Sequence, residues 1–293
     1  MSIVVNTNIG SLNAQRSLAE SSRELSTAME RLSSGKKINS ASDDAAGFAI
    51  AERMTAQVRG LNMATKNAND GLAMLATIEN ATNDVTDMLQ RVRELAVQAA
   101  NDTNSDTDRE YLQLEVDSLL AEINRVSSQT VYNNQNVLDG SRSGTLQVGT
   151  DNGQTIAFNI ESIDTGALGL TNFEVNDADG NAPGTNDYTS TTSSLSVLDA
   201  GAAAEALDKI SIAIEQVAED RAGYGALANR LEYTVSNLMN VAEFTTAARS
   251  RIEDADFAAE SARLAKAQVL QQTGTAMLAQ ANASSQLAIQ LIR

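Results

Sequence analysis

Three polar side chains at alternate positions, Asp102, Asn104 and Asp106, could begin a loop that binds calcium. A calcium loop needs glycine at the position that Thr107 occupies and glutamate at the position of Gln113. Because both of these residues are wrong for the ion, a turn that caps a helix is the better interpretation. We predict no metal site here.

Two other groups of acidic residues could suggest a catalytic or metal site, but neither has the further residues that such a site needs. Asp43 and Asp44 are adjacent, and adjacent residues of a helix point about 100° apart, so they cannot act together on one substrate. We interpret them as the acidic first turn of a helix. The run Asp177-Ala178-Asp179-Gly180 is predicted to be a turn, because nothing nearby in the sequence supplies further metal ligands.

The composition argues against catalysis. The 293-residue chain contains no His and no Cys, the side chains most used for proton transfer near neutral pH, nucleophilic attack and tight metal binding. We therefore expect no enzyme activity and no cofactor. Hydrophobic residues make up 42% of the chain but aromatic residues only 3%, which favours closely packed helices with an aliphatic, alanine-rich core.

Charge is distributed unevenly along the chain. The net charge of -17 opposes binding to nucleic acid or to anionic lipid. Between residues 143 and 208 there are ten acidic residues and no Lys or Arg, which predicts a solvated outer surface. No apolar run is long enough to insert in a membrane, and the N-terminus has no cleavable signal peptide. We expect export, if it occurs, to use another route.

Apolar residues recur at intervals of three and four, the pattern of helices that supercoil together. This spacing predicts helices near residues 18–32, 61–99, 112–126, 207–242 and 257–291, with Gly35 ending the first. The first and last helices have thin stripes that should bury against each other and against further copies of the chain. We assign this polymerisation interface to Leu18, Leu25, Met29, Leu32, Phe257, Leu264, Leu270, Met277, Leu287 and Leu291.

The middle of the chain differs from these helices. Apolar residues alternate on both sides of Asp151-Asn152-Gly153, which predicts a β-hairpin at about residues 143–163. An exposed variable loop is expected at about 171–198, where Pro183 is the only proline of the chain. The expected fold is therefore mainly α: a long antiparallel helical rod, similar to a coiled-coil bundle, with a small β-hairpin region.

Four segments of the sequence closely resemble bacterial flagellins: RLSSGKKINSASDDAAGFAI at 31–50, QRVRELAVQAANDTNSDTDR at 90–109, SRIEDADFAAESARLAKAQVL at 250–270, and MLAQANASSQ near the end. The resemblance implies an inner coiled-coil domain made of residues 1–42 and 248–293. It further implies a spoke at 43–56 and an outer helical domain at 57–247. The chain looks like a short member without large outer domains.

The resemblance also implies a function. It indicates a structural subunit that polymerises into the extracellular flagellar filament used for swimming. The implied partners are copies of itself, an export chaperone, the filament cap and the hook–filament junction proteins, with export through the flagellar type III secretion route. The alternatives are a hook–filament junction protein or another axial component, and a surface hydrolase carried on a flagellin-like rod. The segment QRVRELAVQAAN with a short middle favours the filament subunit.

Two surface features carry further expectations. Arg91, Leu95 and Glu115 match flagellin positions that the animal innate receptor, Toll-like receptor 5, recognises. The alternative is that Arg91 and Glu115 are solvated charges that join neighbouring helices. The exposed loop could carry O-linked sugars, as flagellins often do, or be a plain solvated loop. The candidate positions are Thr189, Ser190, Thr191, Thr192, Ser193 and Ser194.

Overall fold

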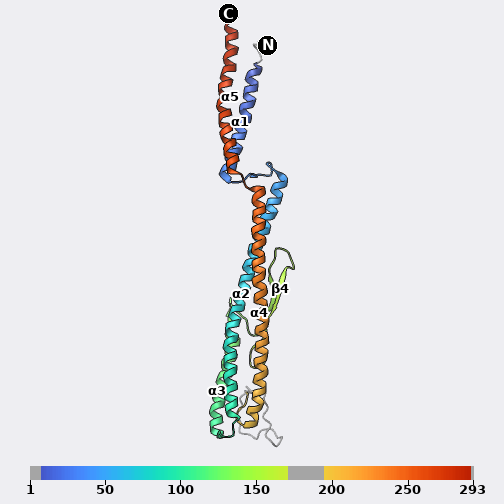
Figure 1. Cartoon of the computed structure of the whole chain (residues 1–293), viewed down its shortest axis with the longest axis vertical. Coiled ribbons are helices and arrows are strands. Elements are labelled where there is room, and N and C mark those ends of the chain that lie inside the picture. Colours follow the sequence, from blue (N-terminus) through green and yellow to red (C-terminus); the bar gives the residue numbers. More distant parts are fainter. Residues whose placement is uncertain (1–7, 171–194, 292–293) are drawn as a thin grey trace. The chain divides into compact units, whose positions relative to one another are not determined.

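The computed structural model describes residues 8–170 and 195–291, and the side chains of the last helix as far as residue 283. The chain divides into two compact units. The first unit comprises residues 1–59 and 241–293, and the second comprises residues 60–240. Within the described residues the structure is mainly helical, as the apolar spacing predicts, and it contains two short antiparallel ribbons (Figure 1).

The first unit is built on α1 (Ile9–Ser34) and α5 (Phe257–Leu291), which lie side by side in Figure 1. The Asn8 side chain begins α1 by accepting a hydrogen bond from the backbone N–H of Ser11 at 3.0 Å. Gly35 ends it with a φ of 72°, a left-handed conformation that suits glycine. The predicted end of the first helix is therefore confirmed.

The paired helices α1 and α5 have few buried side chains among the described residues. Among the described residues of α1 only Ser21 and Ala28 are buried, and α5 contributes Glu260 and Ala267. Small side chains allow two helices to approach closely, but they remove little apolar area from water. The paired helices therefore have a thin core.

A short backbone pairing closes one end of this helix pair. The N–H of Lys37 donates to the Glu253 carbonyl at 2.6 Å, and the N–H of Ala255 donates to the Gly35 carbonyl at 2.9 Å. The Lys36 ammonium also forms an ion pair with the Glu253 carboxylate. These contacts tie the segment after α1 to the segment before α5.

The second unit has a continuous apolar core. It is formed by α2 (Ala45–Ala99), α3 (Asp106–Gln129) and α4 (Ala200–Glu253), of which α2 and α4 also extend into the first unit. Its fully buried side chains include Ile78, Val85, Leu89, Leu95, Ile123, Ile210 and Leu231. Both α2 and α4 begin before the ranges that the apolar spacing marks, and α4 also ends beyond its range.

The buried face of α3 is partly the expected one. Of its apolar stripe, Val116 and Ile123 are buried, whereas Leu112, Leu119 and Val126 are half-buried and pack against the core. The buried line also includes Gln113, Leu120 and Ser127. Two polar residues belong to it because each bonds to backbone across the core, a possibility that a hydrophobicity pattern does not register.

The predicted hairpin is confirmed. Strands β3 (Ser143–Gln147) and β4 (Thr155–Asn159) pair antiparallel, with Leu146 opposite Ile156. The hairpin lies against α2, where a Cβ on Gly71 would come within 2.5 Å of the Leu146 side chain, so a larger residue would require that side chain to move. The Asn67 amide also donates to the Gln147 carbonyl at 3.1 Å.

A second, smaller ribbon was not predicted. It consists of β1 (Val131–Tyr132) and β2 (Gln135–Asn136). Its two turn residues, Asn133 and Asn134, have φ values of 50° and 59°. Asparagine tolerates this conformation better than most residues, and two such residues form the tight turn of a hairpin. The Asn-Asn pair was therefore a usable signal.

The stretch expected to be a solvated outer surface is partly a core. Its apolar residues Ile156, Ile160, Ile163, Leu168, Leu170, Leu195 and Val197 are all buried. Leu195 and Val197 fall inside the range given for the exposed loop, so that range extends too far. Pro183, the Asp177–Gly180 turn and the six candidate sugar-bearing residues lie outside the described residues.

Two side chains of α3 hold the backbone on either side of that undescribed stretch. The buried Gln113 amide donates to the Leu195 carbonyl at 2.8 Å and accepts from the Val197 N–H at 2.7 Å. The Asn124 side chain accepts from the Thr165 N–H and hydroxyl, both at 2.9 Å. The side chains of Gln113 and Asn124 are uncharged, so they can be buried. There they form hydrogen bonds with backbone groups that no neighbouring strand or helix satisfies.

Candidate assembly surface

The residues assigned to polymerisation fall into two groups in α1 and α5. Leu18, Leu25, Leu32 and Leu264 are half-buried. By contrast, Met29, Phe257, Leu270 and Met277 are 56%, 70%, 40% and 64% exposed. Leu287 and Leu291 lie in α5 beyond its described side chains. The described apolar side chains are thus divided between contacts within the chain and an open surface.

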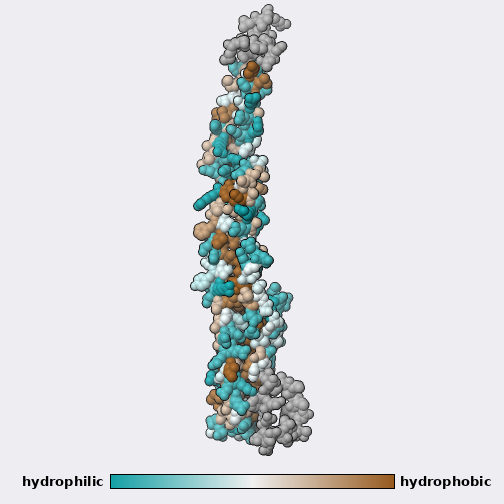
Figure 2. Space-filling model, turned by 90° about the vertical axis from the view of Figure 1, so that its right-hand side faces the viewer, coloured by the Kyte–Doolittle hydropathy of each residue, from teal (hydrophilic) through white to brown (hydrophobic). Residues whose placement is uncertain are grey.

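Apolar patches of this kind recur on the surface. On the face drawn in Figure 2, brown hydrophobic side chains lie between teal hydrophilic ones, and the protein has no single large apolar face in this view. Large exposed hydrophobic residues on helices of the second unit include Tyr111, Leu114 and Tyr233. An open apolar surface distributed along helices suits contacts with many neighbours.

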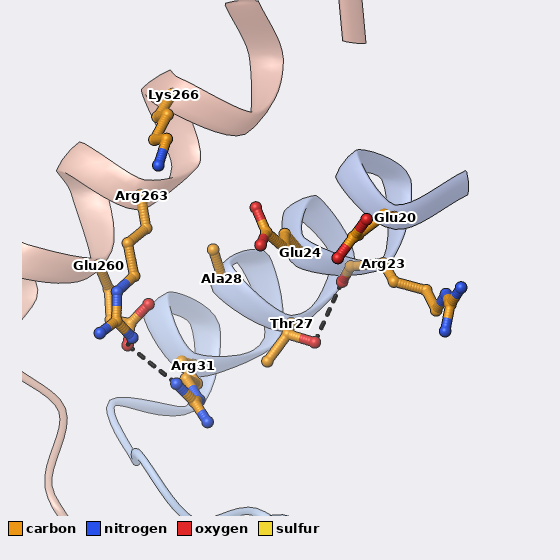
Figure 3. A pocket seen from close by; sticks show the side chains of 9 residues that line it. All are labelled: Glu20, Arg23, Glu24, Thr27, Ala28, Arg31, Glu260, Arg263 and Lys266. Carbon is orange, nitrogen blue, oxygen red and sulfur yellow. Dashed lines mark hydrogen bonds and ion pairs between the residues drawn. The ribbon is translucent and has the colours of Figure 1, made fainter. Parts of the chain in front are cut away.

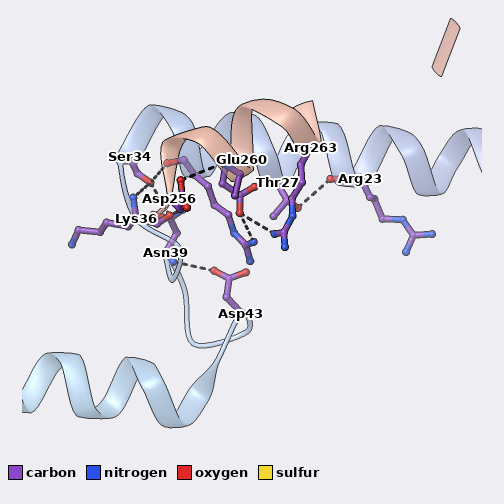
Figure 4. A network of polar contacts seen from close by, with 11 residues as sticks. Arg23, Thr27, Ser34, Lys36, Asn39, Asp43, Asp256, Glu260 and Arg263 are labelled. Atoms are coloured by element: carbon purple, nitrogen blue, oxygen red, sulfur yellow. Dashed lines mark hydrogen bonds and ion pairs between the residues drawn. The ribbon is translucent and has the colours of Figure 1, made fainter. Parts of the chain in front are cut away.

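A buried ionic cluster joins α1 to α5. The Glu260 carboxylate, with 7% of its side chain exposed, accepts a hydrogen bond from Arg31 at 3.1 Å and from Arg263 at 3.0 Å. Figure 3 shows both guanidinium groups directed at this carboxylate, and Figure 4 shows the surrounding polar network. A buried carboxylate that loses its partners is costly, so the cluster fixes how the two helices pair.

A charged groove of about 510 Å³ continues from this cluster between the two helices (Figure 3). Among the described residues, four charged side chains that line it make no ion pair: Glu20, Arg23, Glu24 and Lys266. Beyond Lys266 the sequence contains no charged residue until Arg293. Charge on α5 is therefore confined to its first part, next to the groove.

The segment between α1 and α2 is ordered by two aspartates. The Asp43 carboxylate accepts from the N–H groups of Asn39 and Ser40 at 3.0 and 2.9 Å, and these bonds hold the pKa of Asp43 below its usual value. The Asp44 side chain accepts from the Ala46 and Gly47 N–H groups. Both aspartates precede α2, so the expectation that they form its first turn is wrong, although their role is structural.

The calcium-like sequence is a capped turn. Ser105 caps α3, and its side chain and that of Asp108 form a reciprocal capping box. The Ser105 hydroxyl and N–H lower the pKa of Asp108. The buried Arg109 donates to the carbonyls of Ala99 and Asn101 at 3.0 and 3.3 Å, which satisfies the end of α2. Across the described part of the chain, no group of three or more acidic residues is arranged to hold a metal.

The three residues matched to receptor recognition do not form one surface. The Arg91 guanidinium donates to Glu115 on α3 at 2.9 Å and to Glu94 at 2.8 Å, and these bonds raise its pKa. Both Arg91 and Glu115 are exposed, whereas Leu95 is only 1% exposed and belongs to the core. A ligand on this face could touch the two charges, but the Leu95 side chain supports the helix from beneath.

Sequence reasoning missed Glu260. Its position in the first turn of α5 suits an acidic residue, because helix N-termini attract negative charge. That signal does not distinguish Glu260 from other acidic residues near helix starts. Its partner Arg31 is 229 residues away in the sequence, so only the fold identifies the pair.

No helix in the described residues combines the length and the hydropathy of a membrane span.

Comparisons with known proteins cover nearly the whole chain. Residues 5–143 match the bacterial flagellin N-terminal helical region, and residues 207–292 match the bacterial flagellin C-terminal helical region. The chain is 39% identical over 292 residues to a flagellin of Halalkalibacterium halodurans, with 99% of this chain and 100% of that protein covered. It is 40% identical over 308 residues to a flagellin of Bacillus subtilis, with 99% of each covered. A flagellar filament 33 kDa core protein of Treponema phagedenis is 38% identical, with 99% of this chain and 100% of that protein covered.

Proposed function

The chain belongs to the bacterial flagellin family, whose members are structural subunits of the flagellar filament, and we propose that its α1–α5 pair assembles this subunit into the helical polymer. The observation that carries the proposal is the contrast within this pair. Ser21, Ala28 and Ala267 are buried between the helices, while Met29, Phe257 and other large apolar residues stay exposed.

Assembly and folding of the terminal helices are coupled in this proposal. A pair of helices with so small a buried core gains little free energy to offset the entropy of ordering them. Neighbouring subunits supply the missing apolar contacts by covering Met29, Phe257, Leu270 and Met277. The Arg31–Glu260–Arg263 cluster sets the pairing of α1 with α5, so that this surface is presented in one arrangement.

We propose that the chain has the domain organisation of the family. We assign residues 1–42 and 248–293 to the inner coiled-coil domain, residues 43–56 to the spoke and residues 57–247 to the outer domain. The Asp43 and Asp44 hydrogen bonds order the start of the spoke. Family membership further supports export by the flagellar type III route, with an export chaperone, the filament cap and the junction proteins as partners.

Recognition by Toll-like receptor 5 is a separate proposal about the second unit. The exposed pair Arg91 and Glu115 supports it, because both side chains are open to a partner and come from neighbouring helices. Leu95 contributes only indirectly, as a buried residue that supports the helix carrying Arg91.

O-linked sugars at residues 189–194 are proposed from composition. The intact mass of native filaments, compared with the mass of the bare sequence, tests this proposal.

Seeded polymerisation tests the assembly proposal. We expect the purified full chain to form filaments visible by electron microscopy. A chain shortened before Phe257 should remain monomeric while keeping most of its helical circular dichroism, because the core of the second unit does not include α5. Filaments formed by the shortened chain would refute the role of the α1–α5 pair. Failure of the full chain to form filaments would refute the proposed function itself.

A further inference from the structure

The methionines are the side chains of this protein most open to oxidation. The chain contains 8 Met but no Cys and no Trp. A thioether is a polarisable group that peroxides oxidise to a sulfoxide, and exposed thioethers are the most accessible to them. With thiols absent, the effect of an oxidant on this chain depends on where each methionine lies.

The described methionines differ widely in exposure. Met74 is buried in the core of the second unit, with 4% of the residue exposed. On α2 and α4, Met63 and Met239 are 57% and 59% exposed, about as much as Met29 and Met277 of the first unit. A peroxide can therefore reach these four exposed residues about equally well. Their oxidation is distinguished by its consequence and not by access.

Met29 and Met277 lie toward opposite ends of the α1–α5 pair. Met29 is close in sequence to Arg31, which joins the end of α1 to the start of α5. Met277 lies one turn before Ala281, whose carbonyl accepts a hydrogen bond from the Asn8 side chain at the start of α1 at 2.8 Å. The proposed assembly surface thus carries an oxidisable sulfur near each end.

Both thioethers share a helix face with other apolar side chains. Met277 follows the exposed Leu270 by two helical turns, which places the two residues on one face of α5. Met29 lies one turn from the half-buried Leu25 and Leu32 of α1. A neighbouring subunit that covers these faces would remove both sulfur atoms from water.

We propose that Met29 and Met277 are oxidation sites that control assembly: sulfoxides formed at these positions in the free subunit exclude it from the filament. Hydrogen peroxide transfers one oxygen atom to the sulfur and leaves as water, so the thioether is oxidised and the peroxide is reduced. The proposal rests on the proposed function, because neighbouring subunits must cover these side chains.

Polarity is the physical cause of the exclusion. A sulfoxide converts a flexible apolar side chain into a polar one. Its oxygen is hydrated in the free subunit, and that hydration is lost when a neighbour covers it, which is unfavourable unless a new hydrogen bond forms. A subunit already in the filament is protected, because the same neighbours keep the oxidant from the sulfur.

The partition of partly oxidised wild-type chain tests this proposal without any substitution. The full-length monomer is treated with hydrogen peroxide until part of each exposed methionine is oxidised, then freed of peroxide and seeded with a trace of untreated filament fragments. Sedimentation separates the filaments from the soluble chain. Peptide mass mapping then gives the fraction of sulfoxide at each methionine in both samples.

We expect the sulfoxides of Met29 and Met277 to be enriched in the soluble sample by about tenfold, near the lower end of the cost of burying an unpaired polar group. Met63 and Met239, which are as exposed in the monomer, should distribute evenly between the two samples. Even distribution at all four positions would overturn the proposal, and so would equal enrichment at all four.

Two matched double variants repeat the test by substitution. Met29→Leu with Met277→Leu removes the proposed sites, and Met63→Leu with Met239→Leu removes two equally exposed sulfur atoms from the second unit. Leucine has nearly the volume of methionine but no sulfur. Each treated protein is compared with its own untreated sample.

Peroxide should raise the residual monomer concentration several-fold for the wild type and for the second variant, but not for the first. Equal sensitivity of the two variants to peroxide would contradict the assignment. If the wild type assembles equally well before and after oxidation of Met29 and Met277, only the oxidation proposal fails. If the untreated wild type forms no filaments, the proposed function fails, and this inference fails with it.

Discussion

The two units of this subunit differ in the size of the side chains that they bury. The second unit buries large aliphatic side chains such as Ile78, Leu89 and Leu231 completely, whereas the first unit buries mainly small ones such as Ser21 and Ala28. Since hydrophobic stabilisation scales with the apolar area removed from water, we expect the second unit to fold alone. In the proposed mechanism, neighbouring subunits cover the large exposed apolar residues of the first unit. Folding and assembly would then depend on different parts of one chain.

The largest expected effect concerns the core of the second unit. Leu89→Ala should lower the free energy of unfolding of the monomer by about 3 kcal/mol, because it removes a fully buried side chain and leaves a cavity. Leu264→Ala, in a half-buried position of the first unit, is the matched substitution. It should leave urea unfolding of the second unit unchanged but raise the protein concentration needed for assembly. Equal losses of monomer stability in the two variants would contradict the division of roles.

Glu260→Gln tests whether an ion-pair cluster stabilises the pairing of α1 with α5, where the buried apolar area is small. The amide leaves Arg31 and Arg263 without their shared carboxylate, which should weaken the α1–α5 pair by about 2 kcal/mol. Sedimentation after seeding should show a higher residual monomer concentration than in the wild type. The exposed Glu30 has no ion pair among the described residues, so Glu30→Gln is the control and should assemble normally. Normal assembly of both variants would show that the Arg31–Glu260–Arg263 cluster is not needed for assembly.

Gln113→Ala tests a polar contact in the second unit. It leaves the Leu195 carbonyl and the Val197 N–H without their partner, at an expected cost of about 1–3 kcal/mol in the urea unfolding of the monomer. Gln98 is exposed, so Gln98→Ala should have little effect. If Gln113→Ala were as stable as the wild type, the return of the chain onto α3 would have to be held by Leu195 and Val197 alone.

The smallest expected effect on stability is that of Arg91→Ala. Its ion pairs with Glu94 and Glu115 are exposed, and exposed ion pairs contribute little to stability. Receptor activation measured with the same monomer should nevertheless fall strongly. Arg93→Ala removes an exposed cation nearby and serves as the control. Unchanged activation by Arg91→Ala, with a potent wild-type response, would exclude this face as the recognition site.

The sequence predicts much of the helical fold, because local chemistry decides it. Gly35 ends α1 as expected, and the alternation around Asp151-Asn152-Gly153 identifies the β3–β4 hairpin. The errors arise where distant residues meet. Leu195 and Val197 follow a polar, acidic stretch, yet they are buried because α3 supplies Gln113.

The candidate assembly surface was only partly predictable for the same reason. Apolar spacing identified Met29, Phe257, Leu270 and Met277 as members of stripes, but spacing alone cannot separate a residue that packs within the chain from one left open. Glu260 was missed because its role depends on an ion pair with Arg31, which is distant in the sequence. Leu95 was matched as a receptor contact from its motif, although its burial follows from packing that a motif does not describe.

The two amide side chains of α3 have a consequence for how this protein can change over generations. Asn124 holds the chain at Thr165, and Gln113 holds it again at Leu195 and Val197, so one rigid helix fixes both ends of the intervening stretch. With the ends fixed, the entropy of closing a flexible insertion grows only logarithmically, by about 0.6 kcal/mol for each doubling of its length. We therefore expect a segment inserted between Thr165 and Leu195, such as a displayed epitope, to leave the stability of the helices nearly unchanged.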